Sequence, residues 1–127
     1  MRIIKYSKAF QDHFLQPRHV GEMDHACGTG SAIQEKDGDR ITVYVRIEEG
    51  KIQIRFLVRG CPRIIASASA LAVLVNGKTP EEAMAVREEA IREALELPDP
   101  SFQCPAVPIE AFHRALAQCG YTRIHSK

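Results

Sequence analysis

The chain has 127 residues, of which 45% are hydrophobic and 26% charged, and its formal net charge is +1. This length suits a single domain spanning residues 1–127, and the near-neutral charge gives no reason to expect a nucleic acid or a membrane surface as partner. No apolar run approaches the roughly 20 residues that span a bilayer, and the first residues lack the features of a signal peptide. We therefore expect a cytoplasmic protein.

The chain contains four cysteines, Cys27, Cys61, Cys104 and Cys119. Thiols stay reduced in the cytoplasm, which argues against two disulfides. None of the four belongs to a Cys-x-x-Cys pair, so zinc-ribbon and thioredoxin-like folds receive no support. The sequence therefore predicts cysteines that are free, metal-binding or reactive.

The first half of the chain predicts one short helix and a sheet. Ser7 is a suitable cap for a helix over residues 8–16. Residues 18–30 are glycine-containing and predict a mobile loop. Alternating apolar residues then indicate an edge strand at 31–36, a strand at 40–47 and a strand at 51–58, with tight turns between them. The pattern predicts a three-stranded antiparallel sheet.

The second half predicts helices. One covers residues 62–75, and a second runs from a capping box at Thr79 and Glu82 to about residue 95. A proline-containing break follows, and the last helix covers residues 106–118. Strands followed by helices indicate an α+β fold with the helices packed on one face of the sheet.

Cys61 stands where the third predicted strand gives way to a helix. Pro62 is suited to the first helical turn, so the thiol lies at or near a helix N-terminus. The helix dipole, together with Arg59 and Arg63, favours the thiolate, which is the form that binds metals or attacks sulfur. Cys104 has a similar setting, just before a proline and a predicted helix.

Two carboxylates are expected near these two thiols. An antiparallel meander returns the chain to the end where it began, which brings the turn containing Asp37 and Asp39 to the level of Cys61. The candidate site therefore comprises Asp37, Asp39, Cys61 and Cys104. Thiolates suit zinc and iron–sulfur clusters, whereas carboxylates suit harder, more labile iron. Small buried cysteines and a solvated turn are the simpler interpretation of the same spacing.

Several separated motifs resemble the NifU/IscU-type iron–sulfur cluster assembly scaffold family. They are the opening segment at residues 6–21, Gly-Thr-Gly at 28–30, the Gly-Cys and Ile-Ala-Ser elements of 60–67, Asn-Gly-Lys at 76–78, and Leu-Glu-Leu-Pro at 95–98 followed by Cys104. This resemblance implies a NifU N-terminal/IscU-like fold. It also implies a scaffold that receives sulfur from a cysteine desulfurase, holds a transient [2Fe-2S] cluster, and passes it to chaperones and to carrier or acceptor proteins.

The resemblance assigns cluster ligands, with one departure. Asp37 stands where the family has its first cluster cysteine, whereas the family's aspartate and its other two cysteines correspond to Asp39, Cys61 and Cys104. The histidine that usually precedes the third cysteine is Gln103, a poor metal ligand.

The chaperone-recognition stretch also departs from the family pattern. Ser101 replaces its usual lysine, and Asp99 and Pro100 alter the residues before it. These changes argue against dedicated hand-off to a chaperone.

Other residues are weaker candidates. Cys27 precedes Asp37 by a mostly extended segment of about 30 Å, and Cys119 follows Cys104 by about 22 Å of helix. His13 is expected to pack on the apolar face of its helix. The remaining histidines are expected in loops or at the surface: His19, His25, His113 and His125. Metal binding is left open for His19 and His25, which lie in residues 18–30.

Three functions from different classes follow. The first is a non-enzymatic scaffold in which Cys61, Cys104 and Asp39, with Asp37 as a fourth ligand, bind iron, zinc or a transient [2Fe-2S] cluster. The second is a divergent paralogue that holds no cluster and acts as an interaction or regulatory module for a cysteine desulfurase or another assembly protein. The third is a thiol enzyme with Cys61 as nucleophile, although no histidine base lies near it in sequence.

Overall fold

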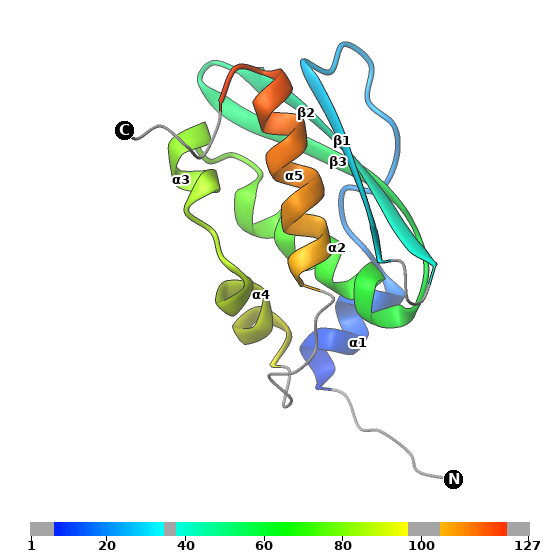
Figure 1. Ribbon diagram of the computed structural model, residues 1–127. Helices are drawn as coiled ribbons and strands as arrows, with labels where there is room; N and C mark the ends of the chain where they lie inside the picture. Colours follow the sequence, from blue (N-terminus) through cyan, green and yellow to red (C-terminus); the bar gives the residue numbers. More distant parts are fainter. Residues whose placement is uncertain (1–6, 35–37, 97–104, 122–127) are drawn as a thin grey trace, which may run out of the picture.

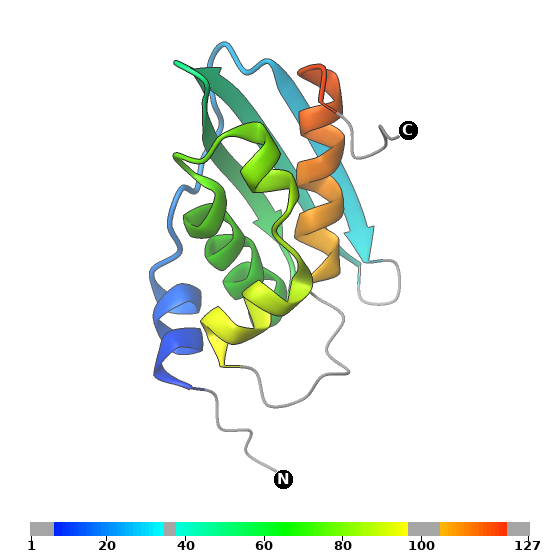
Figure 2. The ribbon, with the colours of Figure 1, turned by 90° about the vertical axis from the view of Figure 1, so that its left-hand side faces the viewer.

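The computed structural model describes residues 7–34, 38–96 and 105–121. A three-stranded antiparallel sheet carries the helices on one of its faces (Figures 1 and 2). This is the predicted α+β arrangement. In chain order the elements are α1 (Lys8–Leu15), β1 (Gly28–Gln34), β2 (Asp39–Glu48), β3 (Lys51–Arg59), α2 (Pro62–Val75), α3 (Pro80–Met84), α4 (Glu88–Leu95) and α5 (Ala106–Gln118).

The central strand β2 pairs with β1 on one side and with β3 on the other. Side chains alternate between the two faces of a strand, so every second residue of β2 enters the core. The register of the strands aligns apolar residues across the sheet, and these residues form the inner face under the helices. Its most buried members are Ala32, Ile41, Val43, Val45, Ile52, Ile54 and Phe56.

Strand β1 begins earlier than the sequence predicts, because two of its residues are glycines that lie against α5. A Cβ atom on Gly28 would lie 1.9 Å from the carbonyl oxygen of Ala115, and one on Gly30 would lie 2.2 Å from that of Ala111. Only glycine permits this approach of helix and strand. The glycines that suggested a loop are therefore a packing surface for α5.

The segment before β1 is also paired over part of its length. His19 and Gly21 exchange backbone hydrogen bonds with Phe56 of β3, at 3.0 and 2.8 Å, so that Val20 forms a parallel bridge at the free edge of the sheet. Sequence composition predicted a loop throughout this segment, and the bridge was not expected.

Cys27 and Cys119 form a disulfide, with their Cα atoms 5.2 Å apart. The prediction of free, metal-binding or reactive cysteines is wrong for this pair. The two residues are 92 positions apart in sequence, and the packing of α5 along β1 brings them together. The bond joins the residue before β1 to the residue after α5.

Helix α2 is the central helix. It contacts strand β3 of the sheet and also the four other helices, α1, α3, α4 and α5. Small side chains allow this crowding, including Ala66, Ser67, Ser69 and Ala70, all of which are buried. Of the described helices, none is both long and apolar enough to cross a membrane.

The expected helix from Thr79 to about residue 95 is wrong in one respect: it is two helices. The capping box is present, since Glu82 N–H donates to Thr79 Oγ1 and Thr79 N–H donates to Glu82 Oε1. The chain then leaves helical geometry at Arg87, whose ψ is 172°. The break lets α3 pack on β3 and α2 while α4 packs on α1 and α2.

A polar network fastens α1 to α2. The Ser69 hydroxyl oxygen accepts the Arg18 N–H at 3.0 Å and lies 2.7 Å from His13 Nδ1. The hydroxyl hydrogen is therefore available for Nδ1, which must be unprotonated to accept it. Burial, reinforced by the Arg18 guanidinium, lowers the pKa of His13, while Asp12 opposes the shift. His13 is thus a packed residue, as predicted.

Breaking the disulfide should destabilise the fold. Cross-linking residues that are 92 positions apart removes much conformational freedom from the unfolded chain, and we expect Cys27→Ser/Cys119→Ser to lower the free energy of unfolding by about 2–5 kcal/mol. Urea unfolding with and without reductant measures the effect, with Cys61→Ser as the control that keeps the bond. Equal midpoints for the oxidised and reduced wild type would contradict this expectation.

Acid should loosen the α1–α2 contact. Because the pKa of His13 in the folded state lies below its ordinary value of 6.5, the stability from its neutral form is present above pH 6.5 and is lost as the pH falls through the lowered pKa. We expect thermal unfolding between pH 7 and 4.5 to show a smaller pH dependence in His13→Gln than in the wild type. Identical pH profiles would rule out this role of His13.

Candidate functional site

Cys61 and Asp39 meet at one end of the sheet. Asp39 is the first residue of β2, and Cys61 is the N-cap residue of α2, directly followed by Pro62. One carboxylate oxygen of Asp39 accepts the Cys61 backbone N–H, and the other accepts the thiol, both at 3.2 Å. The predicted proximity of Asp39 to Cys61 is confirmed.

Gly60 makes this contact possible. Its φ is +157°, and a Cβ atom at this position would lie 2.4 Å from Asp39 Oδ1. Any side chain would therefore push the carboxylate away from Cys61. In the sequence this glycine is recognisable only as part of a family motif, and its structural reason is the close approach of Asp39.

The pair combines a buried acid with a reachable thiol. Asp39 is only 3% exposed, whereas Cys61 is partly exposed and is the one free cysteine among the described residues. Carboxylates are rarely buried without compensation, and here the N-terminus of α2 and the Cys61 N–H supply it. The thiol is therefore held by a fixed partner while remaining accessible from outside.

The geometry of the pair suits a metal ion in place of the shared proton. Tetrahedral coordination, with sulfur at about 2.3 Å and oxygen at about 2.0–2.2 Å, separates the two ligand atoms by about 3.6 Å. The observed separation of 3.2 Å is only a few tenths of an ångström shorter. A small displacement of either side chain would convert the hydrogen-bonded pair into two metal ligands.

The start of α5 lies at the same end of the molecule (Figures 1 and 2). Gly28 packs near Ala115 while Gly30 packs near Ala111, so α5 runs antiparallel to β1. Its first residues therefore point toward the end of β1, where Gln34 pairs with Asp39. Helix α5 begins at this end just after a buried proline, Pro105.

Two members of the predicted site lie outside the described residues. They are Asp37 and Cys104, and the altered family positions at residues 99–103 lie outside as well. Whether these two residues complete the site remains a prediction.

The other candidates lie apart from the site. The Cys27–Cys119 disulfide is at the opposite end of β1, where Gly28 pairs with Val45. No group of three or more histidine, cysteine, aspartate or glutamate side chains suited to a metal ion occurs among the described residues. His19 is half-buried, and burial together with Arg55 lowers its pKa, whereas His25 is exposed as expected.

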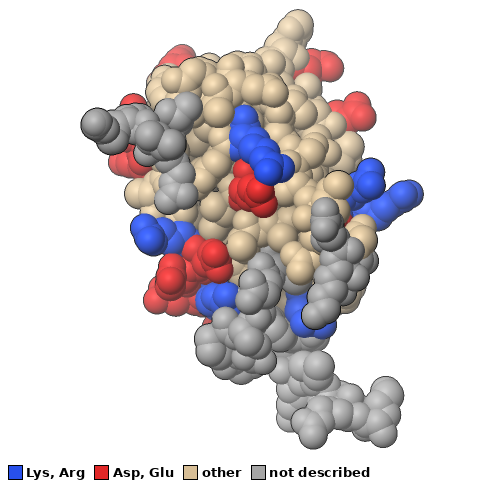
Figure 3. Space-filling view, in the orientation of Figure 1, with Lys and Arg blue, Asp and Glu red and all other residues tan. Residues whose placement is uncertain are grey.

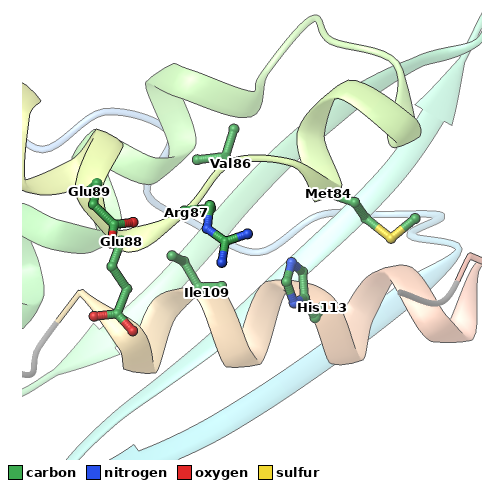
Figure 4. Close-up of a pocket in the computed structure, with 7 residues that line it drawn as sticks. All are labelled: Met84, Val86, Arg87, Glu88, Glu89, Ile109 and His113. Carbon is green, nitrogen blue, oxygen red and sulfur yellow. The ribbon is translucent and has the colours of Figure 1, made fainter. Parts of the chain in front are cut away.

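His113 differs from its prediction as a surface residue, because it is partly buried in a hollow between α5 and the α3–α4 connection. The hollow has a volume of about 230 Å³ and contains no cysteine. Figure 4 shows Met84 and Arg87 on the side of α3 and α4, opposite Ile109 and His113 on α5. This hollow is separate from the Asp39–Cys61 pair, and it has no thiol.

The family of the chain follows from comparison with known proteins. The family model described as "NifU-like N terminal domain" matches residues 5–126. The chain therefore belongs to the NifU-like N-terminal domain family, as its motifs indicated.

Particular relatives carry the name iron–sulfur cluster assembly scaffold protein IscU. The chain is 35% identical over 113 residues to IscU 1 of Archaeoglobus fulgidus, covering 87% of this chain and 74% of that protein. It is 34% identical over 117 residues to IscU of Escherichia coli K12, covering 88% of this chain and 91% of that protein.

Solved structures show the same fold. A putative iron–sulfur cluster assembly scaffold protein for the SUF system from Fervidobacterium islandicum matches with a TM-score of 0.72 and 22% identity, over 87% of this chain and 96% of that one. The N-terminal part of a NifU-like protein from Brucella abortus matches with a TM-score of 0.73 and 17% identity, over 90% and 93%.

The contact between Gly60 and Asp39 can be tested by a matched pair of substitutions. Gly50 also has a positive φ, +77°, but a Cβ there would meet nothing within 4 Å. Both Gly60→Ala and Gly50→Ala strain the backbone, and only the first displaces Asp39. We expect Gly60→Ala to cost about 1–3 kcal/mol more in free energy of unfolding, measured by urea denaturation. Equal losses would show that the carboxylate does not depend on Gly60.

Proposed function

We propose that this protein is an iron–sulfur cluster assembly scaffold that binds iron or a transient [2Fe-2S] cluster and transfers it to acceptor proteins. The observation that carries the proposal is the Asp39–Cys61 pair at the N-terminus of α2, in a member of the NifU-like family. Its relatives named IscU scaffold proteins support the same function. The protein is a carrier, and the cluster is its cargo.

In this proposal Cys61 is the first thiolate ligand, and Cys104 is the second. Cys104 precedes Pro105, the N-cap residue of α5, and Asp37 precedes Gly38, whose N–H donates to the carbonyl of Gln34 at the end of β1. Asp37 then supplies a carboxylate where the family has a thiolate. Sulfur comes from a cysteine desulfurase, and iron–sulfur carrier or acceptor proteins receive the product. Zinc is a further candidate for the same ligands, since it accepts both sulfur and oxygen.

Asp39 has a separate role in the proposal. Its carboxylate is a harder ligand than a thiolate, so it binds iron in a more labile way. It can also hydrogen-bond to the Cys61 thiol when the cargo has left, as it does in the structure. We propose that Asp39 completes the loaded site and favours release, because it stabilises the empty state.

A second candidate is a paralogue that holds no cluster and serves as an interaction module for a desulfurase or another assembly protein. One observation favours it: Asp39 and Cys61 already satisfy each other's hydrogen bonds, so this pair is chemically complete without a metal. In that case partner binding would survive Cys61→Ala. A thiol enzyme has less support, because no described histidine forms a hydrogen bond with Cys61.

Anaerobic reconstitution separates these functions. We expect the wild type, supplied with iron and desulfurase-generated sulfide, to gain visible absorption and about two irons and two sulfides per site. Cys61→Ala should lose both, and Cys61→Ser/Asp39→Asn should lose them as well. Cys27→Ser/Cys119→Ser is the control that removes two other sulfur atoms and should keep the cluster. A folded, colourless wild type would favour the cluster-free module.

Release can be tested with Asp39→Asn. The asparagine amide oxygen still accepts the Cys61 N–H, but the side chain has no negative charge with which to bind iron. We expect the loaded variant to transfer its cluster to an apo-ferredoxin more slowly than the wild type, by about tenfold, the scale on which single groups around a metal site act. Transfer monitored by circular dichroism measures the rate, and a faster transfer would contradict the role assigned to Asp39.

A further inference from the structure

The sheet has one face without helices. Residues of β1, β2 and β3 that alternate with the core residues point to this face, and three rows of them lie toward the end of the sheet that holds Asp39. We call the nine residues of these three rows the outer sheet face: Ile33, Arg40 and Arg59; Ser31, Thr42 and Leu57; Thr29, Tyr44 and Arg55. Arg46, Glu48, Lys51 and Gln53 continue the same side of the sheet toward its other end and are not included.

The outer sheet face is basic. It contains three exposed arginines, Arg40, Arg55 and Arg59, and no acidic residue. Arg40 and Arg59 are directly opposed across the strands, an arrangement of like charges that destabilises a sheet. None of the three forms an ion pair within the described parts of the chain. The row of Arg40 and Arg59 therefore carries positive charge that no ion pair in the described parts of the chain compensates.

Apolar side chains lie among these arginines. Ile33, in the row of Arg40 and Arg59, is 53% exposed, and Leu57 in the next row is 39% exposed. Arginine next to exposed apolar or aromatic surface is the composition of protein–protein interfaces, in which a few such residues carry most of the binding energy. A nucleic acid would gain little from the exposed Ile33 and Leu57.

The charged row also borders the candidate site. Arg40 directly follows Asp39, and Arg59 precedes Cys61 by two positions. Because neighbouring strand residues point to opposite faces, Arg40 lies on the outer face and Asp39 on the inner one, so a protein seated on the outer sheet face would approach the thiol around the end of the sheet. Helix α4 carries three glutamates, Glu88, Glu89 and Glu93, against one arginine, Arg92. Figure 3 shows acidic and basic side chains on the face of the molecule that is seen in Figure 1. A partner's acidic surface would thus be attracted to the sheet and repelled by α4.

We propose that the outer sheet face is the docking surface for an acidic protein that exchanges cargo at the Asp39–Cys61 site. The proposal rests on the scaffold function above. Arg40 and Arg59 attract the acidic partner, and Ile33 and Leu57 form the apolar centre of the contact. Docking at this end would bring the partner to the end of the sheet where Cys61 lies.

Cluster transfer provides the test. The protein is loaded chemically with iron and sulfide, which requires no partner, and then mixed with an acidic apo-ferredoxin as the probe. For the wild type we expect transfer to slow as salt rises from about 50 to 500 mM, because salt screens surface charges. For Arg40→Glu/Arg59→Glu we expect transfer at least about tenfold slower at low salt, with the salt dependence lost. Rates are compared per loaded cluster.

Two control variants isolate the position of the charge. Lys78→Glu/Arg87→Glu makes the same change in net charge outside the outer sheet face and should transfer like the wild type. Arg40→Lys/Arg59→Lys keeps the charge and should retain most of the rate. If the reversal on the sheet and the reversal elsewhere slow transfer equally, the proposal is wrong.

Failure of docking and failure of the scaffold function give different results. If all variants load and the sheet reversal transfers like the wild type, the docking surface is refuted while the scaffold stands. If no variant loads, the scaffold function fails, and binding of the unloaded chain to the same apo-ferredoxin, measured by fluorescence anisotropy, still decides the docking. A sheet reversal that weakens binding to duplex DNA but leaves ferredoxin binding unchanged would assign the surface to nucleic acid and overturn the proposal.

Discussion

The contact between the Asp39 carboxylate and Cys61 joins the sheet to the central helix. Asp39 is buried at the head of β2 and accepts both the N–H and the thiol of the residue that begins α2. Helices α1, α3, α4 and α5 all pack against α2. A single polar contact therefore helps to fix the starting point of the helix on which the helical layer depends, and it fixes the direction of the thiol at the same time.

Under the proposed function, this contact allows a small fold to hold cargo without binding it permanently. The two ligand atoms already lie at 3.2 Å through a shared proton, so the empty site has its polar groups satisfied. In the proposed function, loading replaces the proton with a metal ion, and unloading restores the hydrogen bond. A site whose loaded and empty states are both chemically complete is suited to transfer, whereas a site with unpaired groups would favour permanent binding.

The two faces of the sheet have different roles: the inner face packs the core, and the outer face carries exposed charge. The inner face supplies the core, with Gly28 and Gly30 allowing α5 to lie directly on β1 and the Cys27–Cys119 disulfide closing the far end. The outer face keeps opposed arginines at the end where the thiol lies. An arrangement that costs stability and borders a reactive group is more readily explained by recognition than by folding.

The sequence by itself determined the strands that alternate regularly, the helix of residues 62–75, the last helix, and the meeting of Asp39 with Cys61, because periodicity, caps and an antiparallel turn are local signals. Tertiary structure decided the rest. Gly28 and Gly30 resemble loop residues until α5 lies on them, and Cys27 and Cys119 are 92 positions apart until that packing joins them. Likewise, the break before Arg87 and the opposed pair of Arg40 and Arg59 arise from contacts between elements, which no local pattern contains.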